Sequence, residues 1–179
     1  MALDSDFDLL NSVNKNTTLF IIPNINKIHR IATSIVKLFV KKKYVGIYVC
    51  LNKPCKIVKN ILKENKVDTN RLFFIDCITP YITNHCDNVY VCLPNDLSRL
   101  SIVIHEFVNS IKEKKYIIID ALAVLLIYNQ EKLVIKFVNS LIELAKKSKT
   151  KLIVLTQDIK KGNILDKIVP SFDEVLRDN

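Results

Sequence analysis

Short runs of β-branched and aromatic residues alternate along the chain with longer segments whose apolar residues recur every three or four positions. The short runs predict strands and the longer segments predict helices, because side chains repeat with period 2 in a strand and 3.6 in a helix. The predicted strands are residues 17–22, 44–51, 71–76, 88–93, 115–119 and 151–156. The predicted helices are residues 25–41, 54–65, 96–112 and 130–147, with a partly helical end at 163–177 that breaks at Pro170.

This alternation is typical of βαβ units and predicts a three-layer α/β domain, with a mainly parallel sheet covered by helices on both faces. Residues 1–179 are expected to form one domain, in which residues 1–15 are an N-terminal extension with a loosely attached helix. Two helix starts have candidate caps: Asn95 or Asp96 for the helix at 96–112, and Asn129 for the helix at 130–147.

The composition is that of a soluble globular protein, with 49% hydrophobic and 25% charged residues. The longest apolar stretch, residues 116–128, is interrupted by Asp120 and is too short to span a bilayer, so no membrane association is expected. The first residues are acidic where a secretion signal is basic, and the cysteine count of five is odd. We therefore expect a cytoplasmic protein with reduced thiols.

The turn after the first predicted strand, residues 23–30, contains no glycine, and the whole chain has only two. A phosphate-binding P-loop needs glycines because its backbone N–H groups wrap closely around the phosphates. Pro23 also removes one of these donors. The basic residues that follow, Lys27, His29 and Arg30, can attract an anion, but a solvated helix face is the favoured interpretation.

Five segments, taken in order, resemble the RecA superfamily and in particular its KaiC-like branch, over about residues 16–160. They are TTLFII, YVGIYVCLNKP, RLFFIDCITP, YIIIDALAVLLIYN and KLIVLTQD. The fourth has the form of a Walker B strand that ends in Asp120, and the fifth ends at the family's γ-phosphate-sensing position, where Thr156 and Gln157 stand. The resemblance implies a RecA-like, P-loop NTPase-like fold.

The departures from this family decide the expected function. The Walker A motif is missing, and Leu51-Asn52 replaces the catalytic acid at the end of the second strand. We therefore expect a degenerate, archaeal-type member that is not an enzyme and has no cofactor. Asp120 is expected to serve as a hydrogen-bonding residue rather than a metal ligand. A remnant nucleotide site would comprise Lys27, Asn52, Asp120, Thr156 and Gln157.

No spacing typical of a metal site or a nucleophilic triad is present. His85-Cys86-Asp87 lacks the C-x-x-C or H-x-x-x-H pattern of a zinc site, so no metal is expected. His105-Glu106 lies off the apolar stripe of its helix and is interpreted as a surface pair. Three cysteines in apolar surroundings are expected to be buried: Cys50, Cys55 and Cys92.

The formal net charge is +9, and two helices carry basic residues along one side each. The residues are Lys27, Arg30, Lys37 and Lys41 on the first helix and Lys56, Lys59, Lys63 and Lys66 on the second. They fit phosphate contacts along a nucleic acid, although few aromatic residues accompany them. They also fit solvated helix faces in a chain whose abundant Lys, Asn and Ile indicate an AT-rich genome.

The segment at 121–128 is more apolar than a surface loop, so it is either core or a subunit contact. RecA-like domains commonly assemble by placing one subunit's edge against the next subunit's nucleotide face. The sequence thus leads to a non-catalytic regulatory, sensory or assembly domain that acts through a protein partner or as a homo-oligomer. Two alternatives stay open: a nucleic-acid-binding module, and a sensor of a small anionic ligand or nucleotide.

Overall fold

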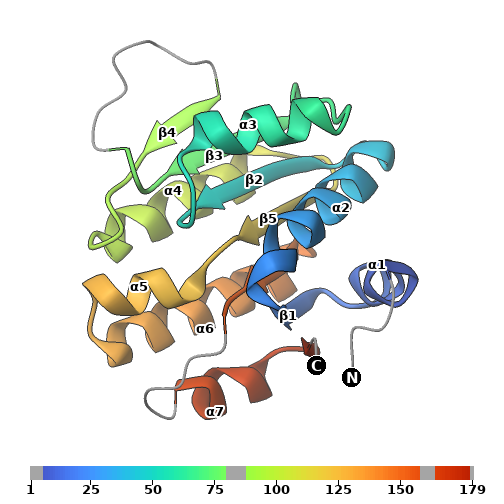
Figure 1. Ribbon diagram of the computed structural model, residues 1–179. Helices are drawn as coiled ribbons and strands as arrows, with labels where there is room; N and C mark the ends of the chain where they lie inside the picture. Colours follow the sequence, from blue (N-terminus) through green and yellow to red (C-terminus); the bar gives the residue numbers. More distant parts are fainter. Residues whose placement is uncertain (1–5, 80–87, 158–163, 178–179) are drawn as a thin grey trace.

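The computed structural model describes residues 6–79, 88–157 and 164–177, and its centre is a sheet of seven strands (Figure 1). Every pairing among these residues is parallel, in the order β4-β3-β2-β5-β6-β1-β7. The strands are β1 Thr18–Ile22, β2 Val45–Cys50, β3 Leu72–Asp76, β4 Val89–Val91, β5 Lys115–Ile119, β6 Lys151–Leu155 and β7 Glu174–Arg177. The three-layer α/β prediction with a parallel sheet is confirmed.

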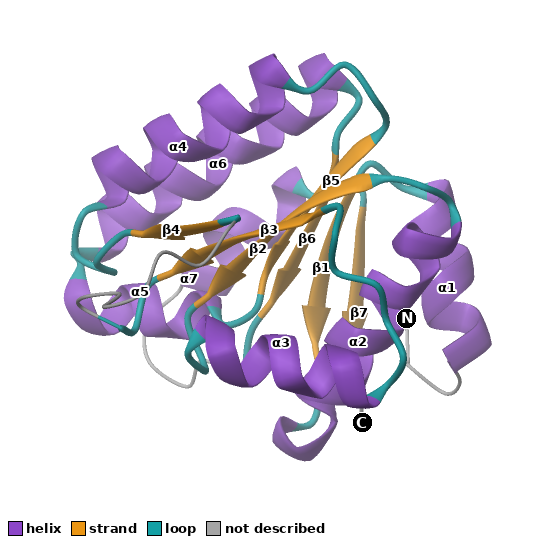
Figure 2. Cartoon of the chain, turned by 90° about the horizontal axis from the view of Figure 1, so that it is seen from above, coloured by secondary structure: helices purple, strands orange, loops and turns teal. Residues whose placement is uncertain are grey.

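Helices cover both faces of the sheet (Figure 2). On one face lie α1 Asp6–Lys15, α2 Ile28–Lys41, which follows the short 3-10 helix η1 Ile25–Lys27, and α3 Cys55–Glu64. On the other face lie α4 Leu97–Ser110, α5 Leu122–Tyr128, α6 Glu131–Ser148, α7 Ile164–Ile168 and the 3-10 helix η2 Val169–Ser171. Within the described part of the chain, no helix is long and apolar enough to cross a membrane.

The central strands are buried on both sides, so their residues divide alternately between two apolar layers. In β5, Tyr116 and Ile118 pack toward α1–α3, whereas Ile117 and Ile119 pack toward α4–α7. Burying a side chain of this size stabilises the fold by roughly 1.5–3 kcal/mol. The unbroken apolar runs that predicted central strands therefore reflect a real two-sided burial.

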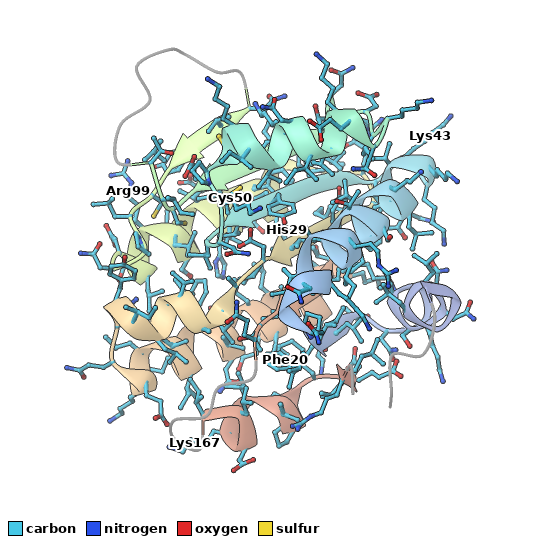
Figure 3. The ribbon with its side chains drawn as sticks, viewed as in Figure 1. Phe20, His29, Lys43, Cys50, Arg99 and Lys167 are labelled. Carbon is cyan, nitrogen blue, oxygen red and sulfur yellow. The ribbon has the colours of Figure 1, made fainter. Side chains whose placement is uncertain are left out.

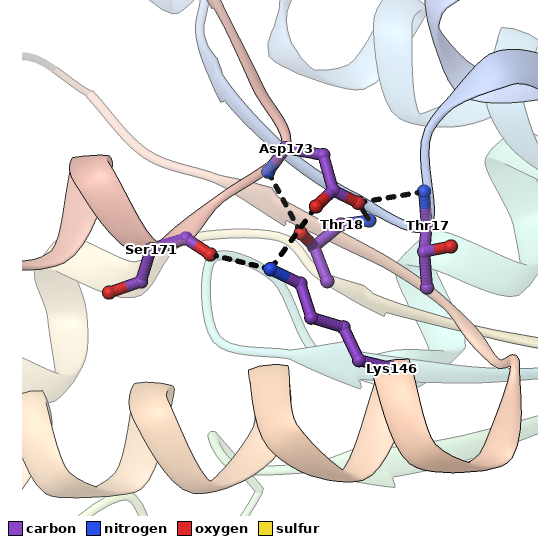
Figure 4. Close-up of polar contacts among 5 residues, drawn as sticks. All are labelled: Thr17, Thr18, Lys146, Ser171 and Asp173. Carbon is purple, nitrogen blue, oxygen red and sulfur yellow. Dashed lines mark hydrogen bonds and ion pairs between the residues drawn. The ribbon is translucent and has the colours of Figure 1, made fainter.

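The C-terminal strand β7 was not predicted, and it adds an edge to the sheet beside β1. Asp173 attaches it there: its carboxylate accepts hydrogen bonds from the backbone N–H groups of Thr17 (3.0 Å) and Thr18 (2.9 Å) (Figure 4). Lys146 of α6 completes the junction, at 3.1 Å from the Asp173 carboxylate and 3.2 Å from the carbonyl oxygen of Ser171.

Two other predictions were wrong. The helix α1 is not loosely attached, because Leu9 and Val13 are fully buried in the layer beneath α2. Asn129 does not cap α6; its amide donates instead to the carbonyl oxygens of Pro94 (2.8 Å) and Leu125 (2.9 Å). The predicted Asp96 cap of α4 is confirmed by a 2.9 Å hydrogen bond from the Arg99 N–H.

The strand order places a topological switch point between β1 and β6. The chain leaves β1 toward α2 on one face, and after β6 it continues to α7 on the other face. The two strand ends are held together by a 3.1 Å hydrogen bond from the Thr156 N–H to the Ile21 carbonyl. In open parallel sheets, ligands bind in the crevice at such a point, beyond the carboxyl ends of the strands.

Candidate functional site

The residues that directly follow β1, β2, β3, β5 and β6 lie at the carboxyl edge of the sheet, because the strands are parallel (Figure 1). Four of the five predicted nucleotide-site residues lie within two residues of three of these strand ends: Asn52, Asp120, Thr156 and Gln157. Lys27 stands at the end of η1, just before α2. The structure joins Asn52 to Asp120 by a hydrogen bond, as described below, and whether the five bind nucleotide stays a prediction.

The turn after β1 folds upon itself and has no phosphate cradle. The side chain of Asn24 accepts a 3.1 Å hydrogen bond from the Asn26 N–H, and the Asn24 carbonyl accepts a 2.8 Å bond from the Lys27 N–H. These two N–H groups stand where a P-loop would present its backbone donors. Both are engaged within the turn and are not directed at a ligand.

Asp120, directly after β5, is fully buried and bonded to the end of β2. Its Oδ1 atom accepts hydrogen bonds from the backbone N–H groups of Leu51 (2.7 Å) and Asn52 (3.1 Å). These donors lie beyond the last residue of β2 and would otherwise be buried without a partner. The expectation that Asp120 is a hydrogen-bonding residue is thus consistent with its contacts.

The second oxygen of this carboxyl, Oδ2, accepts no hydrogen bond from the described residues. Burial raises the pKa of Asp120 from its usual 3.8 to about 7, and the Leu51 and Asn52 N–H groups oppose that rise in pKa. The buried Tyr48 hydroxyl interacts with the same carboxyl, and burial together with the Asp120 charge raises the pKa of Tyr48. Asp120 is therefore a carboxyl group that changes charge near neutral pH.

Asp76, the last residue of β3 and part of the RLFFIDCITP segment, is a second buried carboxylate that is not among the five predicted nucleotide-site residues. It accepts backbone hydrogen bonds from Cys55 (2.9 Å), Ile78 (2.9 Å) and Thr79 (3.0 Å), and a 3.0 Å bond from the Thr79 hydroxyl. Burial favours the neutral acid, but these donors outweigh it and lower the pKa of Asp76. The only sequence signal was an acid ending an apolar run, the same signal that marked Asp120.

Two basic side chains, His29 and Lys53, lie near each other on the α2 side of this edge. His29 (labelled in Figure 3), in the first turn of α2, is half-buried, and its pKa is lowered by burial and by the nearby ammonium group of Lys53. Lys53 belongs to the loop between β2 and α3. The start of α2 and the loop after β2, which are separate in the sequence, therefore place their basic groups next to each other.

An apolar pocket of about 410 Å³ lies on the other side of the edge. Its lining consists of Leu51, Cys77, Ile78, Leu93, Pro94, Asn95, Val124 and Tyr128. Leu93 is 48% exposed and Tyr128 is 56% exposed, whereas Leu122 and Leu125 of the same helix α5 are fully buried. The apolar segment at 121–128 is thus part core and part exposed rim.

The remaining candidate residues have structural surroundings. Cys50, Cys55, Cys77 and Cys92 are buried, which confirms the expectation for three of them, Cys50, Cys55 and Cys92. His85, Cys86 and Asp87 lie outside the described residues. His105 is half-buried, with Nδ1 at 2.8 Å from the Ser101 carbonyl oxygen. Within residues 6–79, 88–157 and 164–177, no three His, Cys, Asp or Glu side chains cluster to hold a metal ion.

Comparison with known proteins places the chain in a family and shows its fold. Residues 7–179 match DUF7090, a family of unknown function, and the chain belongs to that family. No curated protein matches the chain.

Two solved structures share the fold. The KaiC-like protein PH0186 from the hyperthermophilic archaeon Pyrococcus horikoshii OT3 aligns with a TM-score of 0.66 at 10% identity, over 90% of this chain and 71% of that one. The uncharacterized protein PH0321 from Pyrococcus horikoshii, solved with an unknown peptide, aligns with a TM-score of 0.66 at 14% identity, over 96% and 82%. The fold is therefore KaiC-like, as the sequence resemblance implied.

Proposed function

We propose that this chain is a non-catalytic KaiC/RecA-like domain that acts as a regulatory or assembly component through protein contacts. The observation that carries the proposal is the use of the acid at the Walker B position. Asp120 holds the end of β2 through the Leu51 and Asn52 N–H groups, and burial raises its pKa to about 7. A carboxyl that is half-protonated near neutral pH and faces backbone donors is poorly suited to position Mg²⁺.

The apolar pocket at the carboxyl edge supports a protein contact there. Its exposed rim residues, Leu93 and Tyr128, stand where RecA-like subunits commonly meet a neighbour. A second copy of this chain is the partner we propose. Exposed apolar side chains that surround a pocket are typical of interaction sites, since contact with a partner removes them from water.

Sedimentation velocity over a range of protein concentrations tests the assembly. We expect the wild type to self-associate and a Leu93→Glu/Tyr128→Glu variant to remain monomeric, because burying the two new charges in the contact is unfavourable. The matched control is Ile102→Glu/Leu133→Glu, which changes two exposed apolar residues on α4 and α6. A wild type that is monomeric at high concentration contradicts assembly, as does an equal loss in both variants.

Phosphate release from ATP with Mg²⁺ tests the absence of catalysis. We expect the wild type and Asp120→Ala to release phosphate at the same background rate. Turnover by the wild type that Asp120→Ala abolishes would overturn the non-catalytic proposal.

A sensor of a small anionic ligand is the second candidate, favoured by the adjacent basic groups of His29 and Lys53. A ligand that binds only the folded state raises its stability, by about 2.7 kcal/mol at a hundred times its Kd. Thermal unfolding with millimolar ATP, ADP or GTP, with and without Mg²⁺, measures this effect. A rise in Tm without turnover supports the sensor, and an unchanged Tm contradicts it for these nucleotides.

A further inference from the structure

The excess of positive over negative charge in this protein comes from one part of the chain. Residues 23–67 contain eleven lysines and arginines and a single acid, Glu64. The other residues hold sixteen basic and seventeen acidic side chains, so they are close to neutral. Codon usage in an AT-rich genome acts on the whole chain, and it does not account for a charge that is concentrated in a quarter of the residues.

The fold places this charged part on one face of the sheet. Residues 23–67 form α2, β2, α3 and their loops, and β2 is buried in the sheet. Both helices cover the same face, side by side with α1 (Figures 1 and 2). The opposite face, covered by α4–α7, carries basic and acidic residues together.

The lysines on α2 and α3 face away from the sheet. The apolar sides of these helices are buried, as Ile35 and Phe39 in α2 and Leu62 in α3 show. Lysines at helical spacing on the other side are exposed: Lys37, Lys41, Lys56 and Lys63. Lys59 of α3 is half-buried, with its ammonium group 5.0 Å from the centre of the Phe74 ring, so packing holds one of the charges on α3 in place.

We propose that the helical face formed by α2 and α3, here called the basic face, binds the sugar-phosphate backbone of double-stranded nucleic acid without reading its sequence. Lysine ammonium groups bind phosphates as point charges, and the release of counterions from the duplex favours the contact. This surface is separate from the carboxyl-edge pocket, so the two proposals can fail independently.

The composition of the basic face favours a duplex over other polyanions. Single-strand binders stack bases on exposed aromatic side chains, but from α2 to β5 the described aromatic rings on this side are buried or half-buried: Phe39, Tyr44, Tyr48, Phe74 and Tyr116. A helix that binds a membrane surface inserts its apolar side into the lipid, and here the apolar sides of α2 and α3 are covered by the sheet.

Fluorescence anisotropy with a labelled duplex of mixed sequence tests the proposal. We expect the logarithm of the binding constant to fall linearly with the logarithm of the salt concentration. The variant Lys37→Glu/Lys41→Glu/Lys56→Glu/Lys63→Glu should bind at least about a hundredfold more weakly, with a salt slope smaller by about 3 to 4. The corresponding four Lys→Arg changes should retain binding, because they keep the charges.

The matched control reverses four exposed lysines outside this face, Lys112, Lys132, Lys136 and Lys147, and so changes the net charge equally. It should bind the duplex within a few-fold of wild type. Equal weakening in both reversal variants would overturn the proposal, because only total charge would then matter. A wild type that ignores the duplex at low salt, or binds only vesicles containing phosphatidylserine, would overturn it as well. A Lys→Gln set at the four positions covers the case in which the Glu variant does not fold.

Discussion

Replacement of Asp120 by Asn is expected to change how the stability of this protein depends on pH. Asn keeps the oxygen that accepts hydrogen bonds from Leu51 and Asn52 but cannot ionise. The carboxyl of Asp120 has a pKa of about 7 in the folded chain and an ordinary value of 3.8. A rise of about three pKa units corresponds to roughly 4 kcal/mol, since each unit is worth about 1.36 kcal/mol.

The sign follows from proton binding. Between about pH 4 and pH 7 the unfolded chain has released the Asp120 proton and the folded chain still holds it. The free energy of unfolding of the wild type therefore falls as the pH rises through this window, and levels off above it. The Asn variant lacks this fall, so its stability relative to wild type should increase by roughly 4 kcal/mol from about pH 4 to pH 8.

Urea unfolding followed by far-UV circular dichroism, at several pH values for both proteins, measures the difference. Asp76→Asn is the control of opposite sign, because the hydrogen bonds to Asp76 lower its pKa. In the wild type, the ionised Asp76 stabilises the folded state above about pH 4, and this stabilisation is lost in more acidic solution. The Asp76→Asn variant should therefore be less stable than wild type at neutral pH. A difference between wild type and Asp120→Asn that stays constant from pH 4 to pH 8 would refute the reasoning.

Three further outcomes are expected. Gly46→Ala should destabilise the protein by about 1–3 kcal/mol, because the new Cβ would lie 2.3 Å from the buried Tyr116 ring. The loss of stability should be smaller in a Tyr116→Leu background, and equal losses in urea unfolding would contradict the contact. Asp173→Ala should cost about 1–2 kcal/mol and speed hydrogen exchange in β7, since the Thr17 and Thr18 N–H groups lose their acceptor; unchanged exchange would argue against that junction. In a Cys86→Ser variant, Ellman's reagent should modify the four other thiols only after denaturation, because they are buried. Burial also raises the pKa of at least three of them, Cys50, Cys77 and Cys92, and rapid reaction of the folded protein would disprove the prediction.

Elements with a strong local pattern could be predicted from the sequence. The short β-branched runs of β5 and β6 favour strands, and the amphipathic spacing of α2 favours a helix. The strand β7 has no such pattern: its four residues, EVLR, become a strand because Phe20 and Ile21 of β1 pair with Val175 and Leu176. A strand that depends on pairing across most of the chain carries little local signal.

The candidate site likewise has features that the sequence predicts and features that depend on contacts between distant residues. The missing P-loop could be read from the sequence, since a turn without glycine cannot wrap a phosphate. The hydrogen-bond partners of Asp120 could not be predicted, because they depend on the pairing of β2 with β5, and about seventy residues separate these two strands in the sequence. The role of Asp76 could not be predicted either, because it depends on a hydrogen bond from Cys55, the first residue of α3, which follows the neighbouring strand β2.

Asp120 is linked to the basic face and to the carboxyl-edge pocket through the loop that it holds: Leu51 lines the pocket, and the loop leads into α3. The residue can therefore show whether the two surfaces act together. Its side chain follows the alternation of Tyr116 and Ile118 and so faces the α2–α3 side, whereas the pocket lies toward α5. If the two surfaces act separately, Asp120→Asn should alter stability with pH and leave duplex binding and its salt slope unchanged. A large change in duplex affinity would mean that the loop of Leu51 and Asn52, which Asp120 holds, also sets the position of α3. That loop runs directly into α3 through Pro54, so coupling has a physical route, and the variant measures whether the protein uses it.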